Sequence, residues 1–154
     1  MSVVAAIIER EIELTSRFVA ALNEEQEVLK QGNADALAEL TANKNLLIEQ
    51  LNSLETERIN AVGISGAEPV RGAMEKWLAL HGSDKAAAVN WEKLLNFARE
   101  AKALHELNSQ LVELHLRKTS EILHILTHQP EKQMLYGNTG QTVSATGSRI
   151  VDSA

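Results

Sequence analysis

Apolar side chains recur every three or four residues along most of this chain, which is the spacing that places them on one face of an α-helix. Glycine and proline interrupt the pattern at a few points and divide it into segments. Gly32 is the expected left-handed residue after the first segment, and Ser83 is the expected N-cap of the last. The pattern therefore predicts four helices, over residues 3–30, 34–62, 69–80 and 84–128.

The composition agrees with an all-α fold. Aromatic residues make up 3% of the 154 residues, whereas strands favour aromatic and β-branched side chains. We predict an elongated antiparallel helical hairpin, then a short helix and a long C-terminal helix, all within a single domain over residues 1–128. Residues 129–154 include many Gly, Ser and Thr and offer little apolar surface to bury, so we predict a flexible tail there.

The first two predicted helices can be registered against each other. When the chain folds back at Gly32, residues whose numbers add up to 69 face each other. This register pairs Glu25 with Lys44. It also pairs Glu11 with Arg58, so each charge that interrupts one apolar seam meets an opposite charge on the other. The alternative is a hairpin in which these four charges reach into water independently.

Several classes of function are disfavoured by the sequence. With 0 cysteines the chain has no thiol nucleophile or thiolate zinc site, and it lacks a phosphate-binding glycine loop and a His-Glu-x-x-His motif. The net charge is −6 and no basic face is evident, which disfavours nucleic acid as a partner. No apolar run reaches 18 residues, and the first residues lack a basic signal-peptide region. We therefore expect a cytoplasmic protein without membrane insertion, and neither enzymatic activity, catalytic residues nor a cofactor.

Two residue pairs are candidates for ligand binding, and for both a structural role is favoured. His124 and His128 lie one helical turn apart and follow Glu121 in a Glu-x-x-His motif, which is half of a di-iron signature. The sequence has no second such motif, so a solvated helix face is favoured over a metal site. Trp77 and Trp91 flank the break between the third and fourth predicted helices, and we expect them to pack there rather than stack on a ligand.

The last predicted helix carries more apolar surface than an ordinary helix contact covers. Between residues 104 and 126 its apolar side chains span roughly 200° of the circumference, whereas a surface helix usually buries somewhat more than about 100°. Either this helix is central in a bundle or pairs with a second copy, or the surplus face is reserved for an amphipathic partner helix. Two stripes form the arc: Leu104, Leu107, Leu111, Ile122 and Ile125, and beside them Val112, Leu116, Leu123 and Leu126.

Three stretches carry a resemblance to a known family, and the last of them is the most specific. The first stretch combines Glu25-x-x-x-Leu29, the Gly32-Asn33 turn, Leu40-x-x-x-Lys44-x-x-Leu47 and Arg58. The second is Leu107-Asn108-Ser-Gln-Leu111-Val112. The third is Leu135-Tyr136-Gly137-Asn-Thr-Gly140-Gln141-Thr142. The first resembles the N-terminal hairpin of the FlgN-type flagellar export chaperones. The second is similar to that family's Leu-Asn…Leu-Leu stretch, with Val112 replacing the second leucine, and the third is similar to its C-terminal Tyr-Gly-x-x-Gly element.

The resemblance implies a cytoplasmic, non-enzymatic chaperone of the flagellar type III secretion system. Such chaperones hold the hook–filament junction proteins FlgK and FlgL as cargo and deliver them to the export gate protein FlhA. The resemblance assigns gate docking to Leu135, Tyr136, Gly137 and Gly140. Cargo binding would fall on the last helix, at Leu104, Leu107, Asn108, Leu111, Val112, Leu116, Ile122, Leu123 and Leu126. The rival interpretation is a structural or scaffolding coiled coil that self-associates, for example as a homodimer.

Overall fold

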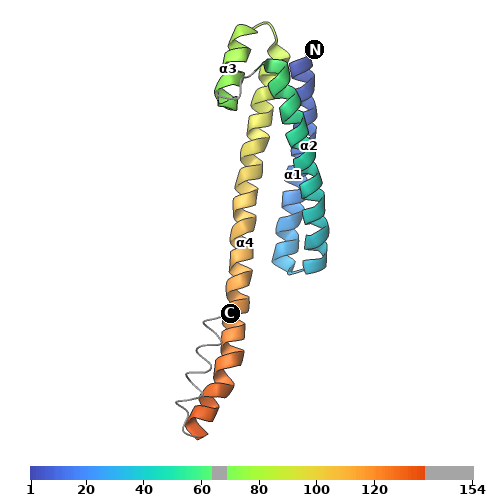
Figure 1. Ribbon diagram of the computed structural model, residues 1–154. Helices are drawn as coiled ribbons and strands as arrows, with labels where there is room; N and C mark the ends of the chain where they lie inside the picture. The colour runs from blue at the N-terminus through green and yellow to red at the C-terminus, as the bar shows by residue number, and fades with distance from the viewer. Residues whose placement is uncertain (64–68, 138–154) are drawn as a thin grey trace. The chain divides into compact units, whose positions relative to one another are not determined.

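The computed structural model describes residues 1–63 and 69–137, with side chains as far as residue 128. Within these residues the chain is helical apart from caps and turns, and it has no strand, so the predicted all-α fold is confirmed. The chain divides into two compact units, Met1–Ser109 and Gln110–Ala154. Four helices make up the described part: α1 (Val3–Gln31), α2 (Ala34–Val62), α3 (Val70–Leu80) and α4 (Lys85–Gly137) (Figure 1).

A two-residue turn connects α1 to α2. Gly32 has a φ of 71°, a left-handed conformation that glycine adopts without a Cβ penalty. Its N–H donates to the carbonyl of Leu29, and the N–H of Asn33 donates to the carbonyl of Val28, each at 3.3 Å. The Asn33 side chain then accepts a hydrogen bond from the N–H of Ala36 at 3.2 Å and caps α2. The hairpin turn predicted at Gly32 is therefore confirmed, and the same two residues end one helix and begin the next.

The start of α4 differs from the prediction by one residue. Asp84, rather than Ser83, is the cap, because its carboxylate accepts a hydrogen bond from the N–H of Ala87 at 3.1 Å. Its negative charge also lies at the positive end of the helix dipole, which a serine hydroxyl does not exploit. A hydrogen bond from the Ser2 side chain, and after it the hydrogen bond from the Ala87 N–H, lower the pKa of the Asp84 carboxyl.

The end of α4 also differs from the prediction. The helix continues past His128 and through Pro130 to Gly137. Proline within a helix removes one backbone hydrogen bond, but the residues at 131–135 are mostly strong helix formers and favour continuation. The backbone of residues 129–137 is thus helical where the sequence predicted a tail, and residues 138–154 lie outside the described residues.

The core of the first unit joins α1, α3 and the first half of α4. One buried cluster contains residues from all three helices, and the partly buried Trp77 packs against it. A second cluster farther along α1 joins Val19 and Leu22 to Ala101 of α4, with Phe97 packed beside them. The predicted packing role of Trp77 and Trp91 is therefore confirmed. The first cluster consists of Val4, Ile8, Met74, Trp91 and Leu94.

The hairpin register is the predicted one. The Lys44 ammonium lies 2.7 Å from the Glu25 carboxylate, and the Arg58 guanidinium lies 2.8 Å from the Glu11 carboxylate. All four side chains are largely or fully buried, so the alternative in which each charge reaches into water on its own is wrong. Because these pairs lie between two seams of apolar residues, they fix which residues of α1 and α2 face each other.

None of the helices in the described residues has the length and apolarity needed to cross a membrane.

Candidate functional site

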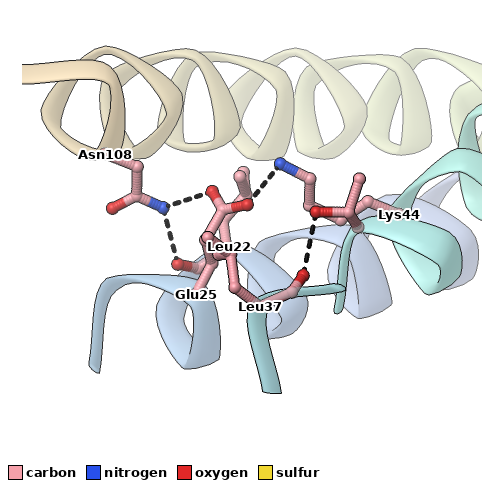
Figure 2. A network of polar contacts seen from close by, with 6 residues as sticks. Leu22, Glu25, Leu37, Lys44 and Asn108 are labelled. Carbon is pink, nitrogen blue, oxygen red and sulfur yellow. Dashed lines mark hydrogen bonds and ion pairs between the residues drawn. The ribbon is translucent and has the colours of Figure 1, made fainter. Parts of the chain in front are cut away.

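A buried polar network joins α1, α2 and α4 within the first unit (Figure 2). The Glu25 carboxylate accepts a hydrogen bond from Lys44 of α2 at 2.7 Å and another from the side-chain amide of Asn108 at 2.9 Å. The same Asn108 amide nitrogen donates to the backbone carbonyl of Leu22 at 2.9 Å. Only 2% of Asn108 and 7% of Glu25 is exposed. The amide therefore ties α4 to the hairpin at the point where α2 is also attached.

The second cross-hairpin ion pair is likewise covered by α4. The Arg58 guanidinium, paired with Glu11, lies 4.9 Å from the centre of the Trp91 ring in a cation–π contact. Burial raises the pKa of the Glu11 carboxyl, and the hydrogen bond and charge of Arg58 offset this rise only in part. Each buried ion pair of the hairpin thus has one α4 side chain over it, Trp91 on one and Asn108 on the other.

Two of the predicted cargo-binding residues lie at this internal contact. Asn108 is buried and donates to Glu25 and Leu22 of α1, and Leu104 is partly buried against the second core cluster. Both pack α4 against the hairpin in this structure, and their assignment to cargo binding stays a prediction. The sequence contains one signal for this role: Asn108 follows Ala101, which follows Leu94, at heptad spacing along the face of α4 that packs on the hairpin.

The remaining predicted cargo-binding residues form an exposed apolar surface on α4, most of it in the second unit. We call this surface the α4 apolar face. Leu111, at its edge, is only partly exposed. Large exposed apolar surfaces of this kind are typical of interaction sites. The members of the face, between 40% and 65% exposed, are Leu107, Val112, Leu114, Leu116, Ile122, Leu123, Ile125 and Leu126.

The histidine pair lies on the polar side of the same stretch of α4. The rings of His124 and His128 are stacked with their centres 3.8 Å apart. Across the described residues, no group of three or more His, Asp or Glu side chains is arranged to hold a metal ion. The pair therefore offers two nitrogen ligands at most, which is fewer than structural or catalytic zinc sites use.

The predicted gate-docking residues lie at the end of α4 or beyond it. The backbone of Leu135, Tyr136 and Gly137 belongs to the last turns of the helix. Their side chains, and all of Gly140, lie outside the described residues. The docking assignment therefore stays a prediction.

Comparison with known proteins gives one family. The family model described as FlgN protein matches residues 1–144 of the chain. A curated relative, the "Flagella synthesis protein FlgN" of Proteus mirabilis, is 32% identical over 127 residues, which cover 78% of this chain and 76% of the relative. No solved structure matches the chain. The family model and the relative both span most of the chain, and the chain therefore belongs to the FlgN family.

Proposed function

We propose that this chain is a cytoplasmic, non-enzymatic chaperone of flagellum synthesis that binds amphipathic terminal helices of the junction proteins FlgK and FlgL. Membership of the FlgN family and the name of the Proteus mirabilis relative support the flagellar role. The observation that carries the binding mode is the α4 apolar face, whose side chains are exposed in the part of the chain that the structure describes. A helix laid along this face would bury apolar side chains on both partners at once.

The size of the face supports cargo binding over a weak incidental contact. Burying a leucine or isoleucine side chain completely contributes about 1.5–3 kcal/mol relative to leaving it in water. The face has eight large apolar residues that are 40–65% exposed, so covering each one contributes about half of that amount. Covering most of the face would offset the entropy that a cargo segment loses when it becomes helical.

Delivery to the export gate forms the second half of the proposal. We assign docking on FlhA to Leu135, Tyr136, Gly137 and Gly140. A tyrosine suits such a contact because its ring buries a large apolar area with few rotatable bonds while its hydroxyl reaches a polar partner. Its place at the end of α4 lies beyond the apolar face in sequence, so cargo and gate could be bound by different residues.

The α4 apolar face also fits a second candidate, a coiled-coil scaffold that self-associates through this surface. The two candidates differ in what occupies the face. A homodimer would bury it in the free protein, whereas a chaperone leaves it available until cargo arrives. Measuring the molar mass of the free chain by light scattering distinguishes them, and a monomer favours the chaperone.

The proposed function is tested by capture of FlgK on the purified chain. Replacing Leu116 and Leu123 together by Ser removes the two most central exposed side chains of one stripe and should weaken capture strongly. The matched control is Leu46→Ser on α2, because Leu46 is 53% exposed but lies off the α4 apolar face. Helix content measured by circular dichroism should stay the same in both variants. Equal capture by wild type and the double variant would refute the assignment of this face.

A further inference from the structure

One charged side chain lies within the α4 apolar face. Helical spacing places Lys118 one turn from Leu114 and Ile122, and two turns from Leu111 and Ile125. Lys118 is exposed, and within the described part of the chain no ion pair or hydrogen bond of its side chain is present. The neighbouring charges of α4 lie on the polar side of the helix, at Glu113, Arg117 and Glu121.

The hairpin shows how this chain accommodates a lysine in an apolar stripe. Lys44 lies on α2 between Leu40 and Leu47, one turn from each, just as Lys118 lies between apolar residues on α4. The helix that covers Lys44 supplies the Glu25 carboxylate at 2.7 Å, and the pair is buried. Covering a lysine with purely apolar residues would instead remove its charge from water without compensation, which is unfavourable.

We infer that the cargo helix that covers the α4 apolar face carries a glutamate or aspartate within its own apolar stripe, and that this carboxylate pairs with Lys118. The inference rests on the proposed function, since it describes the partner of the same surface. It adds a rule for recognition: an amphipathic helix with one correctly placed acid binds, and a uniformly apolar one binds less well. A polar pair within an apolar seam also fixes the register of the two helices.

Charge complementarity favours a cargo helix over a second copy of this chain as the occupant. Within the arc formed by the apolar face, Lys118 is the only residue with a formal charge among residues 107–126. Two copies that paired through this face would bring two lysines to the contact and no carboxylate from within the face itself, because the nearest one, Glu121, lies at its border. Self-pairing would therefore offer each lysine a partner only at the edge of the contact.

The test is the affinity of the full chain for purified FlgK, measured by titration calorimetry at fixed ionic strength. Lys118→Glu should weaken binding by at least about tenfold, because two carboxylates would then face each other in a desolvated contact. The matched control, Arg117→Glu, makes the same change of charge one residue away on the polar side, and its affinity should stay within about twofold of wild type.

Lys118→Met decides between a paired and an unpaired lysine. If a cargo carboxylate faces Lys118, methionine leaves that carboxylate without an opposite charge in the contact, and binding weakens. If the cargo stripe is wholly apolar, methionine removes a desolvated charge and binding becomes tighter. Tighter or unchanged binding by Lys118→Met would overturn the inference.

A charge swap identifies the cargo residue. Each Glu or Asp of the cargo's terminal helix is changed in turn to Lys, and one such change should restore binding to the Lys118→Glu chain. Failure of every swap would also overturn the inference. A Leu114→Ser/Ile122→Ser variant, which changes the apolar residues one turn from Lys118, separates the two levels of the argument. If it weakens binding while Lys118→Met tightens it, cargo binds to this face without an acidic contact. If it leaves binding unchanged, the proposed site itself is wrong and this inference fails with it.

Discussion

Replacing Asn108 by alanine tests whether the buried network holds α4 on the hairpin. The variant loses one hydrogen bond to the Glu25 carboxylate and one to the Leu22 carbonyl, both at 2.9 Å and both away from water. A hydrogen bond to a charged group contributes about 1.5–3 kcal/mol and a neutral one about 0.5–1.5 kcal/mol. Because Glu25 keeps its contact with Lys44, we expect the free energy of unfolding of the first unit to fall by about 2–4 kcal/mol.

Urea denaturation followed by tryptophan fluorescence measures this loss in the relevant unit. Both tryptophans of the chain belong to the core of the first unit, so their signal reports unfolding there rather than in the rest of α4. Ser109→Ala is the control, since Ser109 is exposed and its change should stay within about 0.5 kcal/mol. A loss below about 0.5 kcal/mol for Asn108→Ala would refute the reasoning, because it would mean that the two hydrogen bonds of this buried amide contribute almost nothing to stability.

Three further predictions concern other parts of the chain. Because the pKa of Glu11 is raised, the native state binds this proton more tightly than the unfolded state does, so the resulting stabilisation is present below about pH 4.5 and is lost as the pH rises through the native pKa. The free energy of unfolding should therefore decline more steeply with rising pH for wild type than for Glu11→Gln. Parallel profiles of the two proteins would contradict this. Asp84→Ala should lower the melting temperature while Ser83→Ala leaves it nearly unchanged, and equal effects would contradict the assignment of the cap. Tyr136→Ala should reduce capture of the cytosolic domain of FlhA by the cargo-loaded chain without changing FlgK binding, whereas equal capture would reject the docking role.

The hairpin could be predicted from sequence because every determinant of it is local. Gly32 and Asn33 specify the turn, and once the turn is known a single register follows for two helices of similar length. Two opposite-charge matches then select that register from its neighbours. No comparable rule relates α4 to α1, because the segment between α2 and α4 does not fix an offset between them. The contact of Asn108 with Glu25 therefore emerges only in the folded chain.

The ends of α4 show where local rules compete. Ser83 and Asp84 are both good N-cap residues, and only the geometry of the preceding turn, in which the N–H of Asp84 donates to the carbonyl of His81 at 2.9 Å, selects the second. Pro130 is a strong helix breaker by itself, but the helix formers after it prevail. The surplus apolar face, in contrast, was predictable from spacing alone.

The most direct measurement of the central claim is hydrogen–deuterium exchange of the full chain with and without FlgK. The account predicts that cargo slows exchange of backbone amides between about residues 110 and 126 of α4, where the apolar face is exposed, and leaves the hairpin amides of α1 and α2 unchanged. Unchanged exchange over that stretch of α4, with new protection confined to the hairpin, would contradict the claim that the α4 apolar face receives the cargo.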